Sequence, residues 1–218
     1  MDIARNLQEV RERIARAASR AQRSPDEITL IAVTKGLSSY AVQAAIEAGI
    51  DNIGENRVQE AAIKVSELQS SGLKPVWHMI GHLQRNKVKT AVDIFDIIHS
   101  VDSLRLAMEL NERTKRVMPV MLQVNVSQEH TKGGFAVAEV PDVVSSLRQL
   151  TRLEVTGLMT IAPLMSDPVE TRPIFRSLRQ LRDTTGLRHL SMGMSDDFEV
   201  AIEEGATMVR IGRAIFGG

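Results

Sequence analysis

Short apolar runs alternate with amphipathic helical stretches along this chain, and this alternation limits the folds that the chain can adopt. Stretches such as SSYAVQAAIEAG (38–49) and PIFRSLRQLRDTTG (173–186) separate the runs and end in Gly, as helices often do. Strands that alternate with helices pair in parallel through right-handed crossovers. The apolar runs are ITLIAVT (28–34), DNIG (51–54), PVWHMIG (75–81), IFDIIHS (94–100), MPVMLQVNV (118–126), LEVTGLMTI (153–161), RHLSMG (188–193) and ATMVRIG (206–212).

Eight strand-helix units predict an α/β fold, a single TIM-type (β/α)8 barrel, with a doubly wound parallel sheet as the competing architecture. The two ends of the chain favour the barrel. Ile3, Leu7, Val10 and Ile14 have helical spacing, which predicts an extra N-terminal amphipathic helix. The chain ends at IFGG (215–218), so we expect no helix after the last strand. The extra helix would then cover the outer face of that strand.

Composition excludes several classes of protein. The 218 residues contain no Pro/Gly/Ser-rich linker, which predicts one domain over residues 1–218. Lys plus Arg and Asp plus Glu each number 27, so no net charge draws the chain to nucleic acid or to an anionic membrane. Without Cys there is no disulfide or thiolate site. No run is long enough to span a bilayer, and the N-terminus lacks the apolar segment of a signal peptide. We therefore expect a cytoplasmic protein, and a monomer because no exposed apolar stripe is evident.

Lys35 follows the apolar segment LIAV (30–33), with only Thr34 between them. Function in a TIM barrel lies at the C-terminal ends of the strands, so we expect this side chain to point into the barrel mouth with little room to reach solvent. Partial desolvation favours the neutral amine, the form that Schiff-base chemistry needs. A lysine that reaches the rim or pairs with a carboxylate is the alternative, and the residue taken alone favours that alternative.

The loops after the seventh and eighth runs are where TIM barrels frequently bind phosphate through backbone N–H groups. Ser195 precedes the helical stretch DDFEVAIEEG (196–205), so we expect it to cap that helix and to donate its hydroxyl to a phosphate. Gly212 and Arg213 follow the last run, where a missing Cβ lets the backbone approach an anion. Each loop alone is equally well explained as a structural turn, but both together favour a phosphate site.

Arg210 lies within the apolar last run, so we expect its guanidinium to face the barrel mouth and to find an acceptor there. His78 and His82 are four residues apart, but Gly81 lies between them in a predicted strand, so we expect no metal site. The basic segment 84–89 has no interleaved aromatic residues and predicts a solvated rim rather than a nucleic-acid surface.

Seven motifs in this order resemble those of the pyridoxal phosphate homeostasis protein family, from about Ile28 to the C-terminus. The resemblance implies a barrel like the N-terminal domain of alanine racemase, which is a fold type III protein for pyridoxal 5′-phosphate (PLP). The motifs are AVTKG (32–36), GENRVQE (54–60), WHMIGHLQRNK (77–87), HSVD (99–102), QVNVSQEHTKGGF (123–135), GLMTIAP (157–163) and LSMGMSDDFEVAIEEGATMVRIGRAIFG (190–217).

The same resemblance implies roles for individual residues. Lys35 would carry PLP as a Schiff base. The segment RIGRAIFG (210–217) also resembles a racemase motif, which assigns Arg210 to the pyridine nitrogen and the backbone of Gly212 and Arg213 to the phosphate, with Ser195 beside them. The remaining residues expected to line the pocket are Asn56, His78, Met159 and Ser191.

The family resemblance implies a carrier and regulator in vitamin B6 and amino-acid homeostasis, in transient contact with PLP-requiring enzymes or a regulatory protein. A racemase of this fold needs a second base, a tyrosine from an all-β domain, whereas the only tyrosine here is Tyr40, near the start of the first barrel helix. Arg210 would hold the ring nitrogen unprotonated and weaken the ring as an electron sink. We therefore predict a PLP-binding protein that is not an enzyme. The alternatives are an amino-acid racemase and a phosphate-ligand barrel that uses Lys35 only for its charge.

Overall fold

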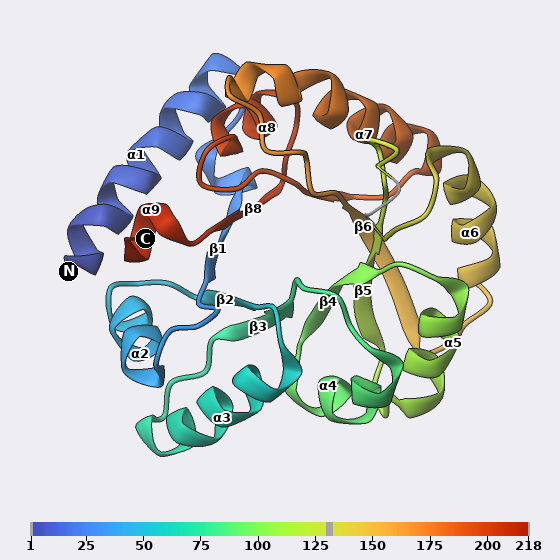
Figure 1. Ribbon diagram of the computed structural model, residues 1–218, viewed down its shortest axis with the longest axis horizontal. Coiled ribbons are helices and arrows are strands. Elements are labelled where there is room, and N and C mark those ends of the chain that lie inside the picture. The colour runs from blue at the N-terminus through green and yellow to red at the C-terminus, as the bar shows by residue number, and fades with distance from the viewer. Residues whose placement is uncertain (1, 130–132, 218) are drawn as a thin grey trace.

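The computed structural model describes residues 2–129 and 133–217, and within them eight parallel strands close into a barrel in sequence order (Figure 1). The predicted TIM-type barrel is confirmed, and the doubly wound sheet is wrong. Part of the motif at 123–135, residues 130–132, lies outside the described residues. The strands are β1 (Thr29–Val33), β2 (Asn52–Glu55), β3 (Val76–Met79), β4 (Ile97–Val101), β5 (Met118–Gln123), β6 (Leu153–Met159), β7 (His189–Ser191) and β8 (Met208–Ile211).

Helices form a ring around the strands (Figure 1). Local chemistry sets several of their ends: the Ser38 hydroxyl accepts from Ala41 N at the start of α2, and Gly186 ends α7 with a φ of 69°. The helices are α1 (Ile3–Arg20), α2 (Ser39–Glu47), α3 (Val58–Leu68), α4 (Val88–Ile94), α5 (Leu104–Arg113), α6 (Val140–Leu147), α7 (Arg172–Thr185), α8 (Phe198–Glu203) and α9 (Arg213–Phe216).

The predicted N-terminal helix is present as α1, and its apolar stripe is buried, including Leu7, Val10 and Ile14. It lies beside α8 and α9 (Figure 1). The expectation that no helix follows the last strand is wrong, because the short helix α9 follows β8. Helix α8 packs against β8, and α1 packs against α8 and α9 rather than covering the strand itself. The Asn6 side chain ties the two helices together by donating to Ile215 O at 3.0 Å.

Side chains that point into the barrel form a core of their own. Alternate residues of a strand face opposite sides, so Ile31 on β1 shares its face with Val33 and Lys35. Ile31 packs with Met121, Met159 and Met208 in a cluster separate from the main core between strands and helices. The barrel is thus filled by side chains below its mouth. Across the described ranges 2–129 and 133–217, no helix is both long and apolar enough to cross a membrane.

The packing of α1 generates the first prediction. Leu7 is 1% exposed, and shortening it leaves a cavity between α1 and the barrel. We expect Leu7→Ala to lower the free energy of unfolding by about 2 to 4 kcal/mol in urea denaturation. Glu9 is the matched control on the same helix, since it is exposed and its ion pair is with Arg5 at 3.6 Å. Glu9→Ala should change the free energy by about 0.5 kcal/mol or less. Equal effects of the two changes would show that α1 does not stabilise the barrel.

Candidate functional site

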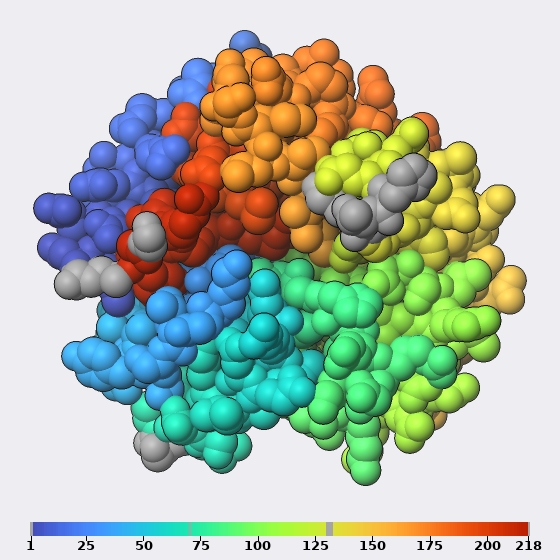
Figure 2. All heavy atoms as spheres, in the orientation of Figure 1, coloured from blue at the N-terminus to red at the C-terminus, as the bar shows by residue number. Residues whose placement is uncertain are grey.

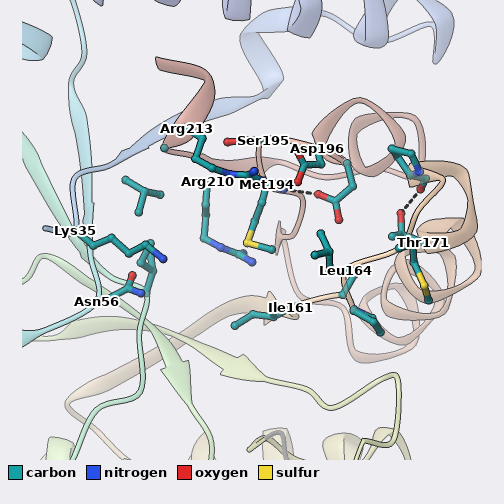
Figure 3. A pocket seen from close by; sticks show the side chains of 18 residues that line it. Lys35, Asn56, Ile161, Leu164, Thr171, Met194, Ser195, Asp196, Arg210 and Arg213 are labelled. Atoms are coloured by element: carbon teal, nitrogen blue, oxygen red, sulfur yellow. Dashed lines mark hydrogen bonds and ion pairs between the residues drawn. The ribbon is translucent and has the colours of Figure 1, made fainter. Parts of the chain in front are cut away.

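One cavity of about 350 Å³ opens at the C-terminal ends of the strands. Figure 2 shows the blue-to-cyan and the orange-to-red parts of the chain meeting across the middle of this face. The close view in Figure 3 places Lys35 and Asn56 on one side of the cavity and Arg210, Ser195 and Arg213 across from them. The lining includes six of the nine site residues that the sequence predicted, namely Lys35, Asn56, Ser195, Arg210, Gly212 and Arg213.

Lys35 reaches the cavity because it continues the inward face of β1, two residues beyond Val33, which also lines the cavity. The predicted direction of the side chain into the mouth is therefore confirmed. The expectation that it has little room to reach solvent is wrong, since Lys35 is exposed. The mouth is wide enough at this edge to leave the side chain open to water.

A clamp from α3 and β2 holds the turn that carries Lys35. The Lys64 ammonium donates to Thr34 O at 2.6 Å and to Glu55 Oε1 at 2.5 Å, and the Thr34 hydroxyl donates to the same carboxylate oxygen. On the other side of Lys35, Gly36 N donates to Glu60 Oε2 at 3.0 Å. Thr34, Glu55 and Lys64 are at most 4% exposed, which makes these contacts strong. The backbone on both sides of Lys35 is thus held by hydrogen bonds, while its side chain is exposed.

Asn56 owes its place at the cavity to a close contact between two strand ends. A Cβ at Gly81 would lie 2.4 Å from Asn56 O and 2.7 Å from Asn56 Cα, so only glycine fits there. Loop β2–α3 can therefore lie flat against loop β3–α4. This contact brings the Asn56 side chain next to Lys35 (Figure 3).

The two loops predicted to bind phosphate, after β7 and after β8, do meet at the cavity. The predicted cap of the helix that follows β7 is not observed. Helix α8 begins after Asp197 rather than Ser195, so the expectation that Ser195 caps it is wrong. Asp197 Oδ1 instead accepts from Met194 N at 2.6 Å, and burial raises the pKa of this carboxyl. Ser195 Oγ accepts from Ala214 N at 3.4 Å, which links the two loops directly. Arg213 pairs with Asp196 in the neighbouring loop.

Arg210 lies at the base of the cavity and is 4% exposed. The expectation that it finds acceptors is confirmed: its guanidinium donates to Ser191 O and Ser191 Oγ, both at 2.7 Å, and to Thr160 O at 2.8 Å. Burial lowers the pKa of Arg210 to about 10, which still leaves it protonated at neutral pH. The cavity therefore has a fixed positive charge at its base.

The other three predicted residues lie below the cavity rather than in its lining. Met159 belongs to the apolar cluster inside the barrel. His78 and Ser191, at 1% and 0% exposure, belong to a polar network that also contains His99 and Arg210. His78 lies one inward position too far from the mouth, because Ile80, the next residue on that face and just beyond β3, does line the cavity. No three His, Asp or Glu side chains in the described part of the chain are grouped so as to hold a metal ion.

Sequence reasoning missed Glu55, Lys64 and His99. Lys64 had a signal, since it lies at helical spacing with the buried residues Ala61 and Leu68 and so occupies a position where an apolar side chain is expected. A lysine at such a position needs a buried acceptor. His99 had the matching signal of a polar residue inside an apolar run. Their partners come from other strands, and the sequence alone does not supply them.

The comparisons with known proteins agree with the fold. The model of the family described as alanine racemase, N-terminal domain, matches residues 5–218. A pyridoxal phosphate homeostasis protein of Escherichia coli strain K12 is 42% identical over 225 residues, which cover 99% of this chain and 96% of that protein. The solved structure of PipY from Synechococcus elongatus with PLP bound has a TM-score of 0.83 at 37% identity, and covers 99% of this chain and 100% of PipY.

An alanine racemase from Corynebacterium glutamicum shows the shared fold, with a TM-score of 0.76 at 21% identity over 99% of this chain and 61% of the racemase. Fold and cavity together define a barrel of the alanine racemase N-terminal domain class. Within that class, the identity to relatives along the whole chain is decisive: this chain belongs to the pyridoxal phosphate homeostasis protein family.

The buried histidines generate the second prediction. Burial lowers the pKa of His78 from 6.5 to about 4, and burial together with the nearby His78 holds that of His99 well below its usual range. Below about pH 6.5 the unfolded chain therefore binds more protons than the folded one, so stability is complete above that pH and is lost as the pH falls towards about 4. We expect His78 alone to account for about 3 kcal/mol of this loss.

Urea denaturation at a series of pH values measures the effect. The control is His82→Gln, because His82 lies exposed on the rim and pairs with Asp102 at 3.0 Å. This variant should keep the same loss of stability in acid. A free energy of unfolding that stays constant through this pH window would contradict the burial of two neutral imidazoles.

Proposed function

We propose that this protein binds PLP as a Schiff base on Lys35 and acts in intracellular vitamin B6 and amino-acid homeostasis as a carrier or regulator of the cofactor, with little or no turnover. Residues 1–218 would form one PLP-binding domain. The observation that carries the proposal is the single cavity that an accessible lysine amine, a buried guanidinium and two polar loops share. Its volume of about 350 Å³ lies in the range of small-molecule sites.

The residues present fit the groups of PLP. Lys35 offers an amine for the aldehyde, and Arg210 offers a hydrogen-bond donor for the ring nitrogen. Ser195, with the backbone at Gly212 and Arg213, offers donors for the phosphate. Asn56 would lie against the ring. His78, Met159 and Ser191 would support the cofactor from below.

The chemistry expected of the chain is limited. Lys35 Nζ adds to the aldehyde carbon, a C=N bond forms and water leaves. Bound PLP supplies an electrophilic carbon and a ring that can accept electrons. Arg210 remains a protonated donor, so it would keep the ring nitrogen unprotonated and weaken that ring as an electron sink. The site is therefore suited to holding the aldehyde rather than to reactions at the α-carbon of an amino acid.

The position of the only tyrosine supports the same view. Racemases of this fold class, as described above, use a tyrosine as the second base. Tyr40 is 79% exposed on α2 and is not among the residues that line the cavity. The relative from Escherichia coli carries the name of a homeostasis protein rather than that of a racemase.

The cellular setting is part of the proposal and rests on the sequence. We propose that the protein works in the cytoplasm as a monomer, and that it contacts PLP-requiring enzymes or a regulatory protein transiently. The monomer is tested by size-exclusion chromatography with light scattering. A stable dimer at micromolar concentration would overturn that part of the proposal and leave the PLP site unaffected.

The third prediction tests the covalent link. We expect the purified protein to absorb in the visible range after incubation with PLP, and borohydride reduction to leave a pyridoxyl group on Lys35. Lys35→Ala should abolish both signals, because Lys35 is the only lysine among the described residues that line the cavity. Lys89→Ala is the matched control, since Lys89 is an exposed lysine of α4, and it should keep both signals.

The outcomes separate three functions. A wild-type protein that PLP does not colour would sink the proposal and favour a site for another phosphate ligand. A coloured protein that racemises alanine or serine at an appreciable rate would support the racemase alternative. A coloured protein that leaves the handedness of both amino acids unchanged would support the carrier.

A further inference from the structure

A row of buried polar side chains runs from Arg210 through the barrel interior. Ser191 Oγ lies 2.7 Å from Arg210 Nη1 and 2.8 Å from His99 Nδ1. His99 Nε2 then lies 2.9 Å from His78 Nδ1, and His78 Nε2 lies 3.0 Å from Asn52 Oδ1. The row crosses strands β8, β7, β4, β3 and β2. Except for Asn52, its members are at most 4% exposed, so the contacts from Arg210 to His78 do not compete with bulk water.

We propose that these side chains form one hydrogen-bond chain with a single direction, from Arg210 to Asn52, in which both imidazoles are neutral and carry their proton on Nε2. Its role is to hold the Arg210 guanidinium as a fixed donor at the base of the cavity. His78, His99 and Ser191 are then positioning residues. Their link to the cofactor rests on the proposed function, whereas the direction of the chain does not.

The direction follows from the chemistry of the first member. A guanidinium can only donate, so Ser191 Oγ accepts from Arg210. The one hydroxyl hydrogen of Ser191 is then available for His99 Nδ1, which must be unprotonated to accept it. A neutral His99 consequently carries its hydrogen on Nε2 and donates to His78 Nδ1. His78 in turn carries its hydrogen on Nε2 and donates to the carbonyl oxygen of Asn52.

The opposite arrangement is worse on two counts. If His99 donated from Nδ1, the hydroxyl hydrogen of Ser191 would need a different acceptor, and the hydrogen bonds of the described residues supply none. The Asn52 side chain would also have to present its NH₂ group to His78, whereas Oδ1 is the atom that faces the ring. In the proposed direction every lone pair points towards the guanidinium, so the dipoles of the chain stabilise the buried cation.

The hydrogen-bond chain holds the guanidinium in place and does not conduct protons. Moving a proton along it would require Arg210 to give up its charge, and a protonated imidazole would have to form in the barrel interior. Burial opposes the second step, since it lowers the pKa of His78 to about 4 and that of His99 well below its usual range. The guanidinium therefore keeps one orientation, and Figure 3 shows it inside the cavity across from Lys35.

Nuclear magnetic resonance tests the direction without any cofactor. We expect long-range ¹H–¹⁵N correlation spectra of the ¹⁵N-labelled protein at neutral pH to show His78 and His99 as neutral rings protonated on Nε2. Loss of signals in His78→Gln and His99→Gln assigns the rings, and Ser191→Ala assigns His99 by its shift if those variants do not fold. Protonation of either ring on Nδ1, or on both nitrogens, would overturn the proposal.

A set of serine variants tests the positioning role. Ser191→Ala should weaken PLP binding roughly tenfold or more, because the charged guanidinium loses an acceptor. It should also change the ring signals of His99, and Ser191→Thr should restore both properties. Ser100 is the matched control: it is a fully buried serine next to His99, and its Oγ has no partner among the described residues. Ser100→Ala should leave affinity and ring signals unchanged.

Unchanged PLP affinity and unchanged His99 signals in Ser191→Ala would overturn the positioning role. The two proposals fail in different ways. If the wild-type protein does not bind PLP, the proposed function fails while the ring signals still decide the direction of the chain. If PLP binds and the rings have the wrong tautomer, only the present inference fails.

Discussion

The pairing of β1 with β8 is the contact on which the site depends. Ile31 lies opposite Arg210 and Ala32 opposite Ile211, residues almost the whole chain apart. This register fixes which inward positions meet at the mouth, since a shift by one residue would turn every side chain of the strand to the other face. Lys35 and Gly212 both continue inward faces of these two strands, so closure of the barrel brings the first and the last motif to one cavity.

A buried cation lies next to this closure, and the polar side chains of the barrel interior are connected to it. Arg210 needs acceptors in place of water, and it finds them on β6 and β7 and, through Ser191, in the two histidines. A second group of interior side chains is apolar, with Ile31 and three methionines in contact. A network of this kind is stabilising only when each donor meets an acceptor, which is why its direction matters. The polar residues below the mouth are thus a consequence of placing a guanidinium there.

Most of the fold and part of the site could be predicted from the sequence. All eight apolar runs became strands, because the pattern of run and helix is local and repeats. The residues at strand ends that face inward, such as Lys35 and Arg210, followed from the fold rule that function gathers at the barrel mouth. Depth was harder. His78 and Ser191 belong to the right strands, yet both lie below the cavity, and only the stagger of neighbouring strands decides this.

The cap of α8 and the exposure of Lys35 were also predicted wrongly, and both depend on the conformation of loops. Ser195 and Asp197 are both good capping residues, and the tight Met194–Asp197 turn decided between them. The exposure of Lys35 depends on how far the surrounding loops stand from it, which no local pattern records. Lys64 is the inverse case: it is a charged residue, yet it is buried against Glu55, a partner that the sequence does not supply.

The clamp around Lys35 fixes its backbone and leaves its side chain exposed, and a carrier would need both properties. Under the proposed function, the imine must form at one defined place, and water must be able to reach it when the cofactor is passed on. Contacts from Glu55, Glu60 and Lys64 fix the backbone on both sides of the lysine, which satisfies the first demand. The exposed side chain of Lys35 satisfies the second. An enzyme gains by excluding water from its reactive centre, whereas a carrier that releases its cargo by hydrolysis needs water there.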